Sequence, residues 1–242
     1  MDKKGWTHTN PIKANCHRSG CRSREGHRYF VGCHLVLEDW DRRWQVTFVD
    51  DEESLGKWLD SYTPVVFDCE ASYVPRRLGL LQLATSKEQH QVLVIDATSK
   101  NINWTKDGKN IKRVFQHRLA GFSIGRTASE SVEQKTGPTG DKMWLENRGV
   151  DEASLAPLRD LQNKKPSTHC FDNFTKTKTS LSLDDFSECL LGRRSKIQLK
   201  KNNEEYLPGW AWEKWKLSDT EIHYAANDVV ALACMLPLLD ST

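Results

Sequence analysis

The stretch PVVFDCEAS, residues 64–72, places two carboxylates at the end of an apolar strand. Residues 65–67 are Val, Val and Phe, and Asp68 and Glu70 follow with one residue between them. Because side chains alternate faces along a strand, Asp68 and Glu70 project side by side. Two like charges this close repel each other unless a cation lies between them. Oxygen ligands suit Mg²⁺ or Mn²⁺, so the stretch predicts a site for a divalent cation.

A second candidate pair lies near the end of the chain, in HYAANDVV. Residues 218–239 have the pattern of a long helix, with Ser218 as its N-cap and Glu221 in the capping-box position. Tyr224 and Asp228 are four residues apart, so they share one face of this helix. The tyrosine could orient an attacking water while the aspartate holds a metal ion. Taken alone, the pair is also typical of a half-exposed helix face.

The rest of the chain predicts one α/β domain of five strands with helices around them. The 242 residues are 38% hydrophobic and 28% charged, which is typical of a soluble globular protein, and the formal net charge is +2. Short connections predict that the second to fourth strands form an antiparallel meander. The expected strands are 44–50, 65–70, 78–85, 90–97 and 119–125, and the expected helices are 51–62, 108–118, 182–191 and 218–239, with a loop at 137–141 and a helix broken by Pro157 at 151–165.

Taken in order, the motifs FDCE, LGLLQLA, LSLDDFSECLLG and YAAND resemble those of DEDDy-type 3′–5′ exonucleases. The most similar branch contains the Werner-type exonuclease domains and the catalytic domain of ribonuclease D, and the resemblance covers about residues 44–240. It implies a ribonuclease H-like fold with a mixed five-stranded sheet flanked by helices. It also implies a two-metal site for magnesium or manganese, with Asp68, Glu70 and Asp228 as ligands and Tyr224 positioning the water. The expected substrate is the 3′ end of a single strand of RNA or DNA.

The second motif of the family departs from the expected pattern. Werner-type proteins have A-G-x-G-x-x-x-D, whereas this chain has AGFSIGRT at residues 120–127, with Thr127 in place of the aspartate. A hydroxyl is a poor magnesium ligand compared with a carboxylate. Glu130 would share a helical face with Thr127 and could substitute for the missing acid. The second metal would otherwise bind weakly, so the alternative is a catalytically impaired pseudo-exonuclease that acts as a nucleic-acid-binding or protein-scaffold module.

Basic and polar residues provide candidate contacts to nucleic acid. Arg193, Arg194 and Lys196 lie in a loop before the last helix and would give salt-sensitive, sequence-independent binding to phosphates. Gln82, on the strand after FDCE, could line the cleft. A solvated loop is the alternative interpretation of the basic segment. The extra helical nucleic-acid-binding domains of ribonuclease D have no counterpart here, so a protein partner would supply such a function.

Residues 1–43 are polar and basic, and we expect a disordered extension before a domain spanning 44–242. Cys16, Cys21, His27, Cys33 and His34 could bind zinc, although their spacing matches no zinc module and a structural or disordered segment is the simpler interpretation. The N-terminus lacks the apolar core of a signal peptide, and no apolar run approaches the length of a membrane span. We therefore expect an intracellular protein, nuclear or cytoplasmic, without a membrane partner.

Overall fold

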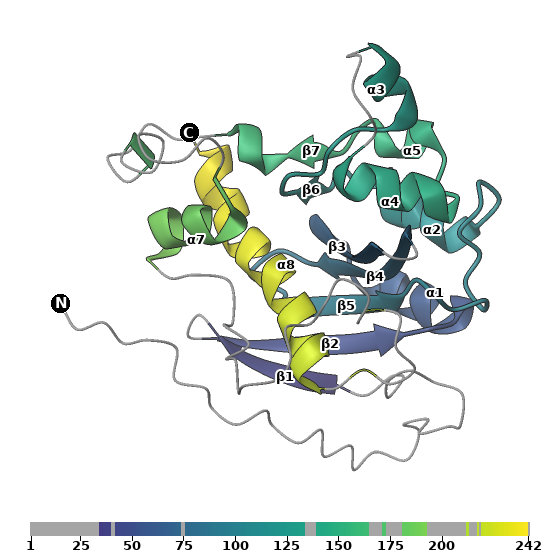
Figure 1. Ribbon diagram of the computed structural model, residues 1–242. Helices are drawn as coiled ribbons and strands as arrows, with labels where there is room; N and C mark the ends of the chain where they lie inside the picture. Colours follow the sequence, from purple (N-terminus) through teal and green to yellow (C-terminus); the bar gives the residue numbers. More distant parts are fainter. Residues whose placement is uncertain are drawn as a thin grey trace, which may run out of the picture.

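The computed structural model contains one seven-stranded sheet with helices on both faces (Figure 1). It describes residues 34–39, 42–73, 76–133, 139–164, 171–172, 181–192, 212, 217 and 219–241. The strands are β1 (His34–Asp39), β2 (Arg42–Val49), β3 (Val66–Tyr73), β4 (Arg76–Ala84), β5 (Gln91–Asp96), β6 (Ala120–Gly121) and β7 (Arg159–Asp160). They lie in the order β1-β2-β5-β4-β3-β6-β7.

The strand pairing confirms the predicted α/β class. β3, β4 and β5 form an antiparallel meander, as the short connections predict. Beyond β3 the sheet continues with β6 and β7 in parallel orientation, and β2 joins its other side parallel to β5. The result is a mixed sheet flanked by helices, the ribonuclease H-like arrangement that the sequence predicts.

The predicted number of five strands was too low, because β1 and β7 were not foreseen. β1 lies within residues 1–43, and it pairs with β2 in an antiparallel ladder that extends from His34↔Thr47 to Asp39↔Arg42. The sheet therefore includes residues that the sequence assigned to the N-terminal extension. β7 comprises two residues, too few to show the alternation by which a strand is predicted.

The helices divide the apolar residues into two cores, one on each face of the sheet (Figure 1). α7 (Leu183–Leu191) and α8 (Asp219–Asp240) cover one face, where Val66, Leu80 and Ala84 of the central strands point. The opposite face packs against α1 (Glu52–Ser61), α2 (Lys109–Gln116), α4 (Gly140–Arg148) and α5 (Glu152–Leu155). The remaining elements are α3 (Ala128–Glu133) and a 3₁₀ helix, η1 (Leu161–Asn163).

Helix ends follow their local sequence signals. At the start of α7, Ser182 and Asp185 form a capping box, and Gly192 ends the helix with φ +70°. Both ends were predicted. α5 stops before Pro157, as predicted, because proline cannot continue a helix. Ser218, the predicted N-cap of the last helix, lies outside the described residues.

Two predictions between β6 and α4 were wrong. The strand expected over 119–125 pairs only at Ala120–Gly121, and Ser123 then turns the chain away with φ +57°. The loop expected over 137–141 gives way to a helix at Gly140, which places Asp141 in the first turn of α4. The sequence therefore missed the start of the helix that carries a buried acid.

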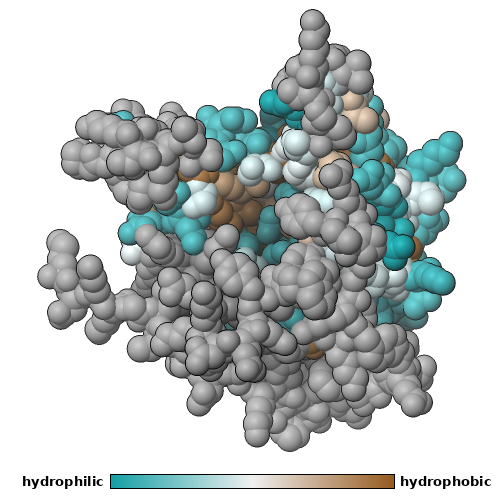
Figure 2. All heavy atoms as spheres, viewed as in Figure 1, coloured by the Kyte–Doolittle hydropathy of each residue, from teal (hydrophilic) through white to brown (hydrophobic). Residues whose placement is uncertain are grey.

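α8 is long and apolar because it crosses the core. Among the described residues, Glu221–Asp240 is the one segment long and apolar enough to span a membrane, which the sequence analysis did not anticipate. Within the protein, 67% of this apolar window is buried. Figure 2 shows hydrophobic surface beside α7 and α8 on the face drawn. The apolar composition of α8 is explained by its packing against β3, β4 and β5.

Candidate active site

Three carboxylates meet where β3 passes beneath α8. One oxygen from each of Asp68, Glu70 and Asp228 lies within 4.8 Å of the others. Asp68 and Glu70 share a face of β3, as their spacing predicts, and Asp228 comes from α8. Ala225 and Ala226 are fully buried, and their small side chains allow α8 to approach the strand closely. The structure therefore brings together the three acids that the sequence singled out.

Tyr224 lies one helical turn before Asp228 and is half-buried. Burial raises the pKa of its phenol well above the usual value, and the nearby charges of Asp228, Glu70 and Asp68 raise it further. The group is therefore a neutral phenol over the whole physiological pH range. A neutral phenol can both donate and accept a hydrogen bond.

A bulge in the sheet lets an aromatic ring support Tyr224. The β3–β4 register shifts between Glu70 and Ala71, and Gly79 is the extra residue on β4. A Cβ at Gly79 would lie 2.6 Å from Cβ of Trp212 and 2.9 Å from its carbonyl oxygen. Trp212 is buried, and its ring centroid lies 6.0 Å from that of Tyr224. Gly79 thus leaves the space in which Trp212 packs beside Tyr224.

A fourth acid that the sequence analysis missed, Asp141, lies near enough to Asp68 for their charges to interact. It is buried in the first turn of α4, and its Oδ2 makes no hydrogen bond with any of the described residues. Burial raises the pKa of Asp141 well above the usual carboxyl value, and the charges of Asp68 and Asp160 raise it further. A buried oxygen without a partner beside a second carboxylate is the environment that a bound cation would satisfy.

Asp141 reaches this place because the chain makes an excursion between β6 and α4. Arg126 and Thr139 pair through two backbone hydrogen bonds, with N···O distances of 2.8 and 3.3 Å, so the chain leaves and returns at one point. Gly125 and Gly140, with φ of +75° and +71°, pack against this crossing, and a Cβ on Gly140 would lie 2.6 Å from the Ile124 carbonyl oxygen. Residues 127–138 therefore stand between the turn after β6 and the start of α4. As a result, Asp141 comes later in the sequence than position 127, where the family pattern expects an acid.

Thr127 and Glu130, the vacant motif position and its expected substitute, bond to each other at the start of α3. The Thr127 hydroxyl donates to Glu152 at 2.7 Å and accepts the Glu130 N–H, while the Thr127 N–H donates to Glu130. These bonds form a capping box at the start of α3. Burial alone would raise the pKa of Glu130, but its bonds from Lys142 and Thr127 hold it below the usual value. Thr127 and Glu130 therefore anchor α3, and Asp141 is the acid beside Asp68.

Gln82 is buried beside Asp68 instead of lining an open cleft. It is directly opposite Asp68 in the β3–β4 ladder, so the two side chains share a face. Its exposed fraction is 0%, which excludes the predicted direct contact with nucleic acid in this conformation. Neither amide atom finds a hydrogen-bond partner in the part of the chain that the structure describes.

The sequence held a signal for Asp141 that a loop assignment concealed. After Gly140 and Asp141, Trp144 and Leu145 are buried, and Gly149 closes the helix with φ +114°. This is the pattern of a short amphipathic helix with an acid in its first turn. Trp212 has no comparable local signal. Arg193, Arg194, Lys196 and the N-terminal residues Cys16, Cys21, His27 and Cys33 lie outside the described residues.

Comparison with solved structures finds chains of similar fold at low sequence identity. NrnC from Brucella melitensis gives a TM-score of 0.43 at 17% identity, over 81% of this chain and 78% of that one. The catalytic core of RRP6 from Trypanosoma brucei gives 0.41 at 14% identity, over 81% and 48%. The EXD2 exonuclease domain soaked in Mn gives 0.32 at 17% identity, over 81% and 89%. No protein-family model and no curated protein matches the chain. The function proposed below therefore rests on the carboxylates themselves.

Proposed function

We propose that this protein is a metal-dependent 3′–5′ exonuclease that hydrolyses phosphodiester bonds of RNA or DNA. The observation that carries the proposal is the meeting of Asp68, Glu70 and Asp228 within 4.8 Å, with Asp141 beside Asp68. Such a set of like charges is costly to bury unless it binds cations. The direction of cleavage rests on the resemblance of FDCE and YAAND to the motifs of the DEDDy family.

The donor set fits magnesium or manganese. All four groups are carboxylates, and hard divalent cations prefer oxygen ligands. Asp68 has Glu70 and Asp228 as neighbours, and the charge of Asp141 also acts on it. Asp68 would then hold two cations, and Asp141 would be a ligand of the second. Bound there, the ions would activate a water molecule as nucleophile and stabilise charge on the departing oxygen.

The remaining groups hold and orient the reactants. Tyr224 keeps its proton because burial and four nearby carboxylates raise its pKa, so it positions the attacking water by a hydrogen bond and does not act as a base. Trp212 packs against Tyr224 and restricts the movement of the phenol ring. The chain thus supplies anionic ligands from β3, α4 and α8, and a neutral hydrogen-bonding group from α8.

Asp141 favours the enzyme over the pseudo-exonuclease. That alternative depends on a missing fourth acid at Thr127. The buried carboxylate of Asp141 beside Asp68 supplies a group of the expected chemistry from a different place in the sequence. A decayed site would have no reason to retain a buried acid whose Oδ2 has no hydrogen-bond partner among the described residues, because an apolar or amide side chain there would cost less.

The direct test is degradation of 5′-labelled single-stranded RNA and DNA. We expect a ladder of products shortened from the 3′ end in Mg²⁺ or Mn²⁺, and none in EDTA. Asp68→Ala should remove the ladder because Asp68 is the one carboxylate that both lies in the cluster with Glu70 and Asp228 and interacts with Asp141. Activity that persists in EDTA or in Asp68→Ala would contradict the proposal. Binding without cleavage by the native protein would favour the pseudo-exonuclease.

Tyr224→Phe tests the role of the phenol. We expect kcat to fall about a hundredfold with KM nearly unchanged, because positioning by a hydrogen-bonding group contributes at least that much. Tyr62→Phe, at the end of α1, is the matched control and should have native kinetics. Since the pKa of Tyr224 is raised, native activity should show no ionisation of this phenol near pH 10, where a free tyrosine titrates. Equal kcat in both variants would remove Tyr224 from the mechanism.

A further inference from the structure

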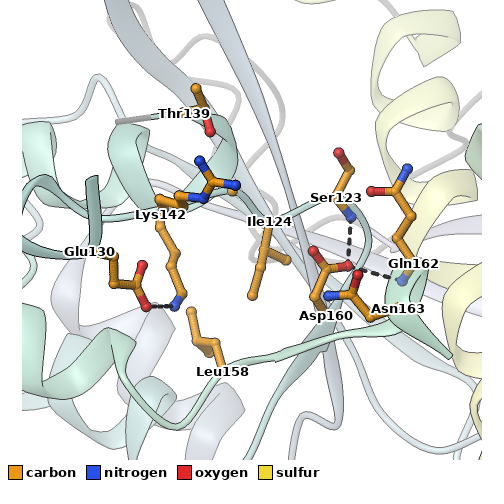
Figure 3. Close-up of a pocket in the computed structure, with 11 residues that line it drawn as sticks. Ser123, Ile124, Glu130, Thr139, Lys142, Leu158, Asp160, Gln162 and Asn163 are labelled. Atoms are coloured by element: carbon orange, nitrogen blue, oxygen red, sulfur yellow. Dashed lines mark hydrogen bonds and ion pairs between the residues drawn. The ribbon is translucent and has the colours of Figure 1, made fainter. Parts of the chain in front are cut away.

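A cavity of about 580 Å³ lies where β6 and β7 end (Figure 3). Its walls come from three places: the turn after β6, the crossing of the excursion with the start of α4, and η1 after β7. This volume falls within the range of sites that hold one small organic ligand. The cavity is lined by Ser123, Ile124, Gly125, Arg126, Glu130, Thr139, Lys142, Leu158, Asp160, Gln162 and Asn163.

Two of the residues that line the cavity adjoin or interact with Asp141. Lys142 lines the cavity, and its neighbour Asp141 is the acid beside Asp68. Asp160 also lines the cavity, and its charge raises the pKa of Asp141. β3, β6 and β7 run parallel, with Val66 level with Ala120 and Gly121 level with Asp160, so Asp68 lies at the level where β6 and β7 end. A strand of nucleic acid held at the carboxylates would therefore pass the cavity.

Ser123 is held in an unfavourable conformation at the cavity wall. Its φ of +57° is one that glycine adopts more readily than serine. Asp160 fixes the turn by accepting the N–H of Ser123 at 3.0 Å and that of Gln162 at 2.9 Å (Figure 3). A glycine at this position would relieve the strain but would remove a hydroxyl from the cavity. Since serine is less stable than glycine at this φ, its presence suggests that the hydroxyl has a function.

The charges that line the cavity are largely balanced, which leaves neutral hydrogen-bonding groups for a ligand. Lys142 Nζ pairs with Glu130 at 2.6 Å on one side of Ile124 (Figure 3). On the other side lie Ser123, Gln162 and Asn163, and Asn163 is exposed (Figure 3). Amide side chains match the donor and acceptor pattern of base edges, and arginine and hydroxyl groups match phosphate and sugar. Arg126 supplies the guanidinium here.

We propose that this cavity binds a nucleotide of the substrate strand adjacent to the one whose phosphodiester bond lies at the carboxylates. Ser123 and Asn163 contact its sugar and base, and Arg126 contacts its phosphate. The inference rests on the proposed function, and it adds a preference for strands longer than one nucleotide. The excursion between β6 and α4 contributes Arg126, Glu130 and Thr139, so this insertion builds one wall of the subsite.

The test compares a strand with a substrate that has one nucleotide. Affinity for a 5′-fluorescein single-stranded oligonucleotide is measured by anisotropy in EDTA, and hydrolysis is measured for the oligonucleotide and for thymidine 5′-p-nitrophenyl phosphate. The variants are Ser123→Gly and Asn163→Ala, with Asn147→Ala, exposed on α4, as the control. Each of the first two should weaken oligonucleotide binding about fivefold, as for loss of one hydrogen bond. Hydrolysis of the one-nucleotide substrate should be unchanged in all three.

The thermal midpoint separates a binding defect from a folding defect. Ser123→Gly should melt at the native temperature or above it, because it relieves the positive φ. Weaker binding with an intact fold supports the subsite. Native affinity in both variants, with native hydrolysis of both substrates, would overturn the subsite and leave the exonuclease proposal standing. A native protein that neither binds nor cuts the oligonucleotide would overturn both.

Discussion

Asp141→Asn is expected to lower the rate of nucleic-acid hydrolysis about a thousandfold, the effect of losing several kcal/mol of transition-state stabilisation. The amide keeps the size of the side chain but removes the charge that would hold the second cation beside Asp68. Raising the Mn²⁺ concentration should recover part of the loss. The measurement is kcat/KM on a single-stranded oligonucleotide as a function of Mn²⁺ concentration.

The same substitution should stabilise the protein when no metal is present. The pKa of Asp141 is raised in the folded protein, so the folded state binds its proton more tightly than the unfolded state does. The free energy of unfolding therefore falls as the pH rises above the ordinary carboxyl pKa. An asparagine at this position does not ionise, so the variant does not lose stability in this way. Asp141→Asn should melt above the native protein in EDTA at neutral pH, and Mn²⁺ should reverse the order.

Two variants control this result. Asp107→Asn removes a carboxylate from an exposed loop and should change neither rate nor melting temperature. Thr127→Asp places an acid at the position that the ungapped motif assigns, but there it would face Glu152 and Glu130, so the rate should not rise and the melting temperature should fall. If Thr127→Asp accelerates hydrolysis while Asp141→Asn leaves the rate intact, the assignment of the fourth acid is wrong.

The part of the site that the sequence predicted depends on local geometry. Asp68 and Glu70 share a face because a strand has a period of two, and Tyr224 and Asp228 share a face because a helix brings residues four apart together. These relations hold whatever the rest of the chain does. The structure brings the three acids together within 4.8 Å, as the motifs predicted.

Asp141 was missed because its place depends on contacts far from its own segment. The pattern after β6 fixes the fourth acid by counting residues, and counting fails when the chain makes an excursion that closes on itself. The closure consists of the Arg126–Thr139 pairing and the Lys142 N–H bond to the Ile124 carbonyl oxygen. Neither interaction has a sequence signature. Counting residues along the ungapped motif therefore assigned the position of the fourth acid to Thr127 instead of Asp141.

The burial of Gln82 illustrates the same limit for the sheet. Its position on β4 opposite Asp68 follows from the meander, but its exposure depends on how closely α8 covers that face. β1 was missed for a related reason, since it is stabilised by pairing with β2 and lies in a segment of polar, basic composition. Tertiary pairing decided both outcomes, and local propensity did not.

Gly79→Ala is expected to reduce both stability and turnover, because the bulge on β4 has no room for a methyl group. The new Cβ would lie 2.6 Å from Cβ of Trp212 and 2.9 Å from its carbonyl oxygen, so backbone must move. Overpacking of this kind costs about 1–3 kcal/mol. Displacing Trp212 also frees Tyr224, so kcat should fall about tenfold or more with little change in KM.

Gly56→Ala is the matched control for this substitution. Gly56 lies inside α1, where a Cβ would lie 3.3 Å from Nδ2 of Asn110, which donates hydrogen bonds to the carbonyl oxygen and to Oε2 of Glu52. Alanine there should leave kcat unchanged, because α1 and α2 pack on the face of the sheet opposite α8. If Gly79→Ala loses stability but retains native kcat, Trp212 supports the fold alone. A loss of kcat larger than the loss of folded protein, and reproduced by Trp212→Leu alone, would assign Trp212 to the positioning of Tyr224.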